Sequence, residues 1–376
     1  MRGNVLSESE ILAKKIADRC CRQNLRQSEG ILEIVNDCSA DLGMKVPEVI
    51  CCETLTRSLS AFYFRKNPYL IYDSCLLEAL YIFDHICLLG NQKNDMKKFF
   101  FKLIGEEFIR NGNLQWSLYF SGKYRTMEYL FEKNEGYDSH TIHYMLSAQT
   151  YFLIGHELGH LAVGRKQGGG VPEDYHKFVR ASMRVLDSRI LEDCTFEQFI
   201  KERYGYFIEK QPTNIEKYYN ELFNSQRFQH FIEECYCDWN GVKLLLEHYN
   251  EPEKSISAIS HVFNYLILQE AIRSDITADK LFFENADHPV SRAMYFSVLR
   301  MEILLLAIQF NKLEKIEDGF RKVQEQFGLM NYWLDIIRDI PSYESFCVVD
   351  EKSIQGMDRK KLTDSLINCF YYAHIE

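Results

Sequence analysis

The sequence predicts an α+β protein that is predominantly helical and has one small antiparallel or mixed sheet. Three observations predict this class. Apolar residues recur at helical spacing over most of the chain, and prolines and glycine-containing turns separate the helical stretches. Two short segments, 49–52 and 59–72, are instead rich in β-branched and aromatic residues, as strands are. With 46% hydrophobic residues and only 7 prolines, the chain can bury a core and has no long low-complexity region.

The N-terminal part is expected to contain one helix followed by the strands of the sheet. Residues 8–38 are predicted to be helical because isoleucine and valine recur there at roughly helical spacing among charged residues. Pro47 breaks that pattern, and the apolar run at 49–52 is of strand type. The runs at 59–64 and 69–72 are rich in aromatic residues and flank a turn, which predicts a β-hairpin.

The rest of the chain is predicted to be largely helical. Asp73 or Ser74 can cap a helix that follows the hairpin. A long apolar helix is expected after Asp138 or Ser139, and the glycine run at 168–170 ends it. Further helices continue to the C terminus, separated by prolines. We find no internal repeat.

Charge and cysteine usage narrow the class of protein. A net charge of -10 argues against a nucleic-acid partner. There is no signal-peptide core, and the longest apolar stretches, 262–268 and 303–308, are far shorter than the roughly 20 residues that span a bilayer. We therefore expect a cytoplasmic protein with no membrane anchor. The sequence predicts no particular oligomeric state. Its 12 cysteines include no CxxC pair and are expected to be reduced and mostly buried.

The motif that carries chemistry is His156-Glu157-Leu158-Gly159-His160, an HExxH sequence inside an apolar helix. The two histidines are four positions apart, about one helical turn, so both imidazoles project from one face and can hold one Zn²⁺. Glu157 lies about 100° further round the helix. There it can act as general base on a zinc-bound water without being a ligand. Two hydrogen-bonded core histidines are the alternative, but a chance motif has no reason to fall between apolar flanks.

A catalytic zinc site needs a third protein ligand and an open fourth position. The best candidate is Glu234, in the segment 231–241 that reads FIEECYCDWNG. Asp238 follows four residues later on the same helical face, where it can fix a histidine tautomer by contacting the other ring nitrogen. Gly241 then puts a small residue on this face, where another helix could approach closely.

Two other ligand sets are compatible with the same segment. Glu233 is adjacent to Glu234, but its neighbour one turn later is Cys237 rather than a carboxylate. Cys235 or Cys237 could also complete the site, because catalytic zinc sites with cysteine ligands exist. A solvated pair of glutamates on a surface helix would need no metal, although the apolar residues around the pair argue against that.

HELGH, followed by E-x-x-C-D with a glycine three residues further on, resembles the gluzincin peptidases of the HtpX, Oma and CAAX-prenyl-protease type. Their usual downstream motif is E-x-x-A-D, so cysteine here replaces another small residue. The segment Ser60-Ala61-Phe62 is similar to the edge strand of that family, which reads N-A-F. The resemblance implies that an extended substrate pairs with this strand and that Ser60, Ala61 and Phe62 border the cleft.

The resemblance extends to Asp287-His288-Pro289 and Arg292, which are similar to the H-P…R element of the family. It implies that His288 is a catalytic residue that helps to stabilise the oxyanion. The pattern departs from the family in that Arg292 comes four residues after His288, where six is usual, and position 294 is methionine. Arg292 is therefore the weaker candidate.

The resemblance also implies a zincin-like fold with the small sheet next to the HExxH helix. On that basis the chain divides into an N-terminal helical segment (1–44), a zincin-like domain (45–300) and a C-terminal helical region (301–376). The segment at about 81–140 is an insert in the domain, suited to a lid or a partner surface. Family members are often embedded in membranes, which this chain is not expected to be.

These observations predict a zinc metallopeptidase that hydrolyses peptide bonds in a specific intracellular protein. The compact form is also similar to the phage-exclusion (Lit-type) peptidases, which are cytosolic HExxH proteases that cleave a host protein during phage infection. The alternative is a zincin-fold sensing or scaffold module with little proteolysis, in a regulatory or phage-defence system. The intact Glu157 argues against an inactive enzyme.

Overall fold

A computed structural model describes residues 29–88, 93–131, 139–165, 170–193, 225–277, 290–310 and 356–370. These ranges are mostly helical and contain one three-stranded mixed sheet, which confirms the predicted α+β class. The strands are β1 (Glu48–Cys52), β2 (Ser60–Phe64) and β3 (Asn67–Asp73). The helices are α2 (Glu29–Asp41), α3 (Ser74–Leu88), α4 (Lys93–Arg110), α5 (Leu114–Arg125), α6 (Ser139–Arg165), α7 (Glu173–Asp193), α10 (Ser225–His248), α11 (Pro252–Thr277), α12 (Val290–Phe310) and α16 (Arg359–Cys369).

The sheet has the strand order β1-β3-β2, so β2 lies at one edge. β2 and β3 form the predicted hairpin, and β1 pairs with β3 in parallel. Arg65 and Lys66 connect the hairpin with φ angles of 47° and 69°. Two consecutive left-handed residues are typical of a type I′ turn, whose twist suits two adjoining antiparallel strands. The turn fixes the register in which Ala61 faces Leu70.

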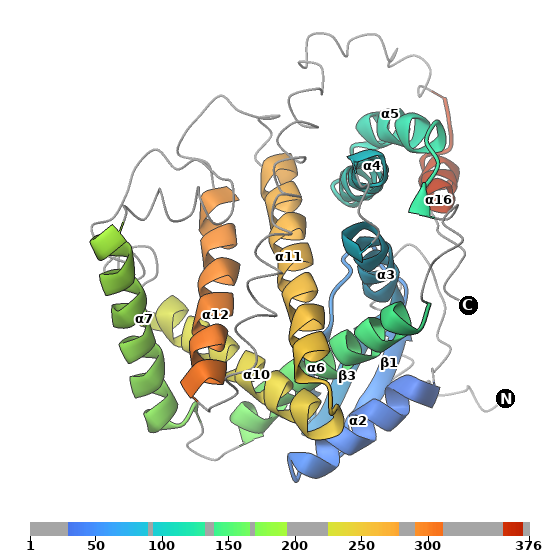
Figure 1. Cartoon of the computed structure of the whole chain (residues 1–376). Coiled ribbons are helices and arrows are strands. Elements are labelled where there is room, and N and C mark those ends of the chain that lie inside the picture. The colour runs from blue at the N-terminus through green and yellow to red at the C-terminus, as the bar shows by residue number, and fades with distance from the viewer. Residues whose placement is uncertain are drawn as a thin grey trace, which may run out of the picture.

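Helix α6 is the element around which the other layers are arranged (Figure 1). It contacts α10, α11, α2 and α3, and its C-terminal half packs against β2. On the side away from the sheet, α11, α12 and α7 follow one another as neighbouring upright helices. The side chains of Ile154, Leu158 and Leu161 are buried on α6, so the predicted apolar helix lies inside the core.

Helices α6 and α10 approach each other backbone to backbone at small residues. A Cβ added to Gly241 of α10 would lie 2.6 Å from the carbonyl oxygen of Phe152, and one added to Gly155 would lie 3.0 Å from the Gly241 Cα. One turn further along, a Cβ on Gly159 would lie 3.2 Å from the Cα of Cys237. Each helix thus has two small residues four positions apart at the contact. The close approach that Gly241 predicted is confirmed.

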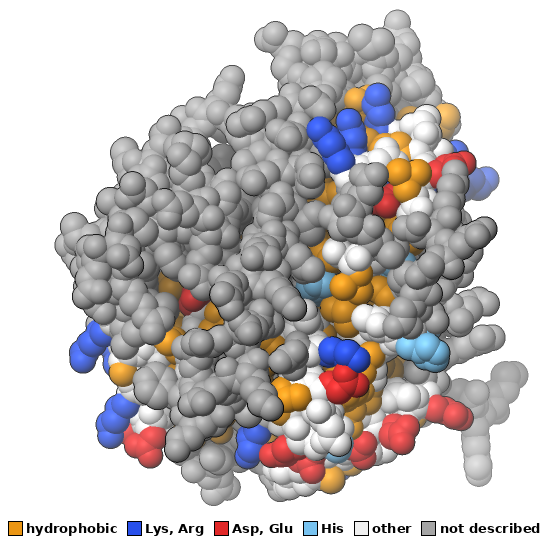
Figure 2. Space-filling view, viewed as in Figure 1, with side chains coloured by type: hydrophobic (Ala, Val, Ile, Leu, Met, Phe, Trp, Pro, Cys, Tyr) orange, Lys and Arg blue, Asp and Glu red, His pale blue; other side chains and the backbone are white. Residues whose placement is uncertain are grey.

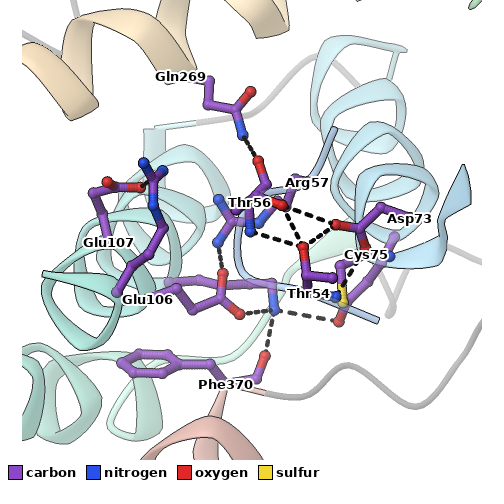
Figure 3. A network of polar contacts seen from close by, with 12 residues as sticks. Thr54, Thr56, Arg57, Asp73, Cys75, Glu106, Glu107, Gln269 and Phe370 are labelled. Carbon is purple, nitrogen blue, oxygen red and sulfur yellow. Dashed lines mark hydrogen bonds and ion pairs between the residues drawn. The ribbon is translucent and has the colours of Figure 1, made fainter. Parts of the chain in front are cut away.

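The loop between β1 and β2, residues 53–59, is held by a buried polar network (Figure 3). Arg57, which is 2% exposed, forms an ion pair with Glu106 of α4. The carbonyl of Thr56 accepts a hydrogen bond of 3.2 Å from Gln269 of α11. Because this loop leads directly into β2, the network fixes the edge strand from the side of α4 and α11.

Lys102 lies at the centre of this network and is fully buried. Its ammonium lies 3.2 Å from Glu78 and 2.9 Å from Glu106, and it also donates to the carbonyl of Phe370 just after α16. The ring of Phe370 occupies the space that a side chain at Gly105 would need. The C-terminal helix is thereby attached to α4, inside the segment predicted to be an insert. Helix α4 is a core helix, because nearly all its side chains from Met96 to Ile109 are buried, which does not suit a lid.

The charged side chains on the face seen in Figure 2 are unevenly distributed. Acidic residues lie along the edge formed by α2 and the start of α11, where Glu29, Glu33, Asp41 and Glu251 are exposed. Several basic side chains lie at the opposite end, near α4 and α5. Among the described residues, no helix combines the length and the apolar character needed to cross a membrane.

The contact between α6 and α10 predicts a clear difference between two glycine substitutions. Gly241→Ala should destabilise the protein by about 1–3 kcal/mol, because the added Cβ collides with the backbone of α6. Gly122→Ala in α5 is the control, since its Cβ would meet nothing within 4 Å. It should be neutral or stabilising by up to about 1 kcal/mol. Urea unfolding measures both, and equal free energies of unfolding for the two variants would contradict the proposed helix contact.

Candidate metal centre

The structure brings the two histidines of the HExxH motif together with Glu234. His156 and His160 project from one face of α6, and the Glu234 carboxylate lies opposite them on α10. The Nε2 atom of His156 is 3.5 Å from Glu234 Oε2, and that of His160 is 3.2 Å from Glu234 Oε1. One potential ligand atom from each residue lies within 4.8 Å of the other two. This group could hold a metal ion, as predicted.

The Nδ1 atoms of both histidines (the outer ring nitrogens) face carboxylates, which leaves the Nε2 atoms (the inner ring nitrogens) for a metal. His156 Nδ1 lies 2.8 Å from Oδ1 of Asp238, the residue predicted to have this role. His160 Nδ1 lies 3.0 Å from Oε1 of Glu233. Histidines that bind metals usually make such a contact through the second nitrogen, which fixes the tautomer and the ring orientation. The donor set therefore fits a metal ion, with Glu233 beside Nδ1 of His160 and Glu234 facing both Nε2 atoms.

The cysteines of α10 do not join this group. Cys235 and Cys237 are fully buried, and neither belongs to the cluster of potential ligands that the described residues form. Cys237 instead packs against Gly159 on α6. Burial raises the pKa of both thiols well above the ordinary value, so both are protonated at neutral pH.

Arg300 of α12, a largely buried cation, completes the charge balance of the site. Its Nη1 lies 3.0 Å from Glu234 Oε2, and its Nε and Nη2 donate to the two oxygens of Asp238 at 2.8 and 2.7 Å. Burial alone would raise the pKa of Glu234, but Arg300 and the two histidines hold it well below its usual range. Burial would likewise lower the pKa of His156, but Asp238 and Glu234 raise it to about 10. A raised pKa favours the doubly protonated, cationic form of His156, and a metal at Nε2 would compete with the proton there.

Glu157 lies beside the edge strand and outside the ligand group. Its Oε2 accepts a hydrogen bond of 2.9 Å from the backbone N–H of Ala61. The hydroxyl of Tyr63 donates to the carbonyl of Leu161 at 3.2 Å, which joins β2 to the same helix. β2 and the HExxH helix are therefore in direct contact at the residue predicted to be the general base.

The three residues predicted to border the cleft have different surroundings. Ala61 contacts Glu157. Ser60 and Phe62 are its neighbours on either side in β2, so their side chains lie on the opposite face of the sheet from that of Ala61. Phe62 stacks on Tyr69 of β3, with the ring centroids 5.9 Å apart. His288 lies outside the described residues, and the side chain of Arg292 does as well. Their predicted roles stay predictions.

Sequence reasoning missed Arg300, although a signal for it exists. From residue 293 to the end of α12 at Phe310, only Arg300 and Glu302 are charged. A charge within an apolar helix indicates a buried ion pair, because burying an unpaired charge is costly. The pattern does not reveal the partner, since Asp238 is far away in the sequence.

Comparison of the chain with family models, with curated proteins and with solved structures found no match.

Substitutions of the two neighbouring glutamates, Glu234 and Glu233, are expected to have different effects on metal binding. Glu234→Gln should bind metal at least about tenfold more weakly, because it removes the carboxylate that faces both Nε2 atoms. Glu233→Gln is the matched control and should keep a stoichiometric metal, because its oxygen faces the outer nitrogen of His160. Elemental analysis of protein purified without added metal, with titration by a competing chelator, measures both. Loss of metal in Glu233→Gln alone would assign the third ligand to Glu233.

Proposed function

We propose that this chain is a zinc-dependent peptidase that cleaves within polypeptide chains. The observation that carries the proposal is that the histidines and Glu157 of the HExxH motif on α6 face different partners. His156 and His160 face Glu234 across the contact with α10, while Glu157 faces the backbone of an edge strand. A group that could hold a metal, a carboxylate beside it and a strand at the edge of the described sheet are the parts that metal-assisted hydrolysis of an extended peptide needs.

The donor set supports zinc as the metal. Two imidazoles and one carboxylate are the ligands of one class of catalytic zinc site, in which the fourth position stays open. A zinc ion held by these residues would lower the pKa of a coordinated water and polarise the scissile carbonyl. Asp238 and Glu233 would keep both imidazoles oriented through their outer nitrogens.

Glu157 is suited to move the proton. As general base it takes a proton from the attacking water, whose oxygen forms a bond with the carbonyl carbon. As the C–N bond breaks, Glu157 delivers a proton to the leaving nitrogen, so that one peptide and one water give a carboxyl and an amine. The hydrogen bond from Ala61 to Oε2 orients the carboxylate and leaves Oε1 for this transfer.

The edge strand offers main-chain groups to a substrate. In an antiparallel pair, successive residues alternately bond to the partner strand and point away from it. Because the Ala61 N–H donates to Glu157, the carbonyl of Ala61 also points away from β3, and so do the N–H and carbonyl of Tyr63. Pro68, which lacks an N–H, stands opposite Tyr63 and agrees with this alternation. An extended peptide that adds to this edge would pass directly in front of Glu157.

Glu157→Gln should separate catalysis from metal binding. The amide keeps the shape of the side chain but cannot accept the proton, so hydrolysis should fall about 10²- to 10⁴-fold while the metal content stays unchanged. The measurement is mass spectrometry of new N-termini after the zinc-loaded protein is incubated with a proteome-derived peptide library. Equal sets of new termini for wild type and Glu157→Gln would contradict the assigned role. If neither protein produced any, the sensing or scaffold alternative would be favoured.

Two substitutions at Ala61 test the contact between β2 and Glu157. Ala61→Pro removes the N–H that donates to Glu157 without removing a bond to β3, so it should keep the fold and the metal. Hydrolysis should fall by up to about 100-fold, because the carboxylate loses its orientation. Ala61→Gly keeps the N–H and should stay close to wild type. Equal activity of the proline and glycine variants in the same peptide assay would show that this hydrogen bond has no catalytic role.

A further inference from the structure

We propose that Arg300 is a positioning residue that restricts Glu234 to one metal-binding oxygen. The inference rests on the proposed metal centre and concerns how that centre is assembled. A carboxylate can bind a metal through one oxygen or through both. The contacts of Glu234 with α12 distinguish its two oxygens. That difference would determine how many of the metal's coordination positions are filled by protein atoms.

The two oxygens of Glu234 have different partners. Oε2 lies 3.0 Å from Nη1 of Arg300 and 3.5 Å from Nε2 of His156. Oε1 lies 3.2 Å from Nε2 of His160 and 3.7 Å from Nε2 of His230, and it has no contact with the guanidinium among the described residues. An oxygen that accepts a charge-assisted hydrogen bond from a guanidinium is a poorer metal ligand, because part of its negative charge is already compensated. Oε1 is therefore the oxygen left for the metal. A single oxygen and two histidines leave the fourth position open for water and substrate.

Arg300 is held firmly enough to impose this choice. Its Nε and Nη2 form a two-pronged pair with Asp238, and its guanidinium lies 5.8 Å from the ring centroid of Phe263 on α11. The side chain of Asp238 is 1% exposed and that of Arg300 is 12% exposed, so water competes little for these contacts. The planar guanidinium is thereby fixed in its plane, and the third nitrogen points at Glu234.

The same side chain connects both halves of the ligand set. Asp238 Oδ1 faces Arg300 on one side and Nδ1 of His156 on the other. Arg300 thus acts on Glu234 directly and on His156 through Asp238. Lysine cannot replace it, because a single ammonium cannot make the two-pronged contact with Asp238 and reach Glu234 at the same time.

The test compares zinc-loaded wild type, Arg300→Met and Arg300→Lys. Crystal structures give the distances from zinc to both Glu234 oxygens, and competition with a chelator gives the zinc dissociation constant. In the wild type, one oxygen should bind at about 2.0–2.2 Å and the other should stay with Arg300. In Arg300→Met, both oxygens should approach zinc, and the affinity should fall about 10- to 100-fold. Arg300→Lys keeps a positive charge and takes the place of the methionine variant in the comparison if that variant does not fold.

The matched control is Arg273→Lys, since Arg273 is a partly buried arginine on α11 that pairs with Glu270. It should leave both the zinc affinity and the coordination of Glu234 unchanged. One-oxygen coordination and wild-type affinity in both Arg300 variants would overturn the positioning role while leaving the metal centre intact. If the wild type bound no zinc, the proposed function itself would fail, and the two failures are therefore distinguishable.

Discussion

The close contact between α6 and α10 is the constraint on which the rest of the site depends. Gly155 and Gly159 on one helix meet Cys237 and Gly241 on the other, and no Cβ lies between the two backbones at Gly241. At such a separation a glutamate on α10 reaches the inner nitrogens of two histidines on α6. A longer separation would leave Glu234 unable to face both rings at once. Gly155, just before the HELGH sequence, and Gly159 within it therefore allow the close packing that places the two histidines opposite Glu234.

Bringing helices this close concentrates charge in a place with little water. Glu234 and Asp238 are both largely buried, and isolated buried carboxylates would be strongly destabilising. Arg300 offsets part of that charge, and in the metal-free protein the raised pKa of His156 adds a proton. A divalent metal ion would take over this compensation and displace the proton. Lys102 likewise compensates buried negative charge elsewhere in the structure, because two carboxylates and the carbonyl of Phe370 surround its buried ammonium.

The parts that could be predicted from the sequence are those governed by local periodicity. His156 with His160, and Glu234 with Asp238, are each four residues apart, so helical geometry alone places each pair on one face. The β-hairpin followed from two aromatic runs around a short turn. The contact of Glu233 with His160, that of Ala61 with Glu157 and the role of Arg300 all depend on how separate elements pack. No spacing in the sequence encodes these distances, because tertiary contacts decide them. A charge inside an otherwise apolar helix was the one local hint of Arg300.

The proposed chemistry requires that α6 and α10 together hold one metal ion. The most direct measurement is X-ray diffraction at wavelengths on both sides of the zinc absorption edge, from crystals of protein purified without added metal. We expect a single anomalous peak that disappears below the edge and lies between His156 Nε2, His160 Nε2 and Glu234. If no peak appeared there even after the crystals were soaked in zinc, the proposed metal centre would be contradicted and the HExxH sequence would be a structural feature of the core.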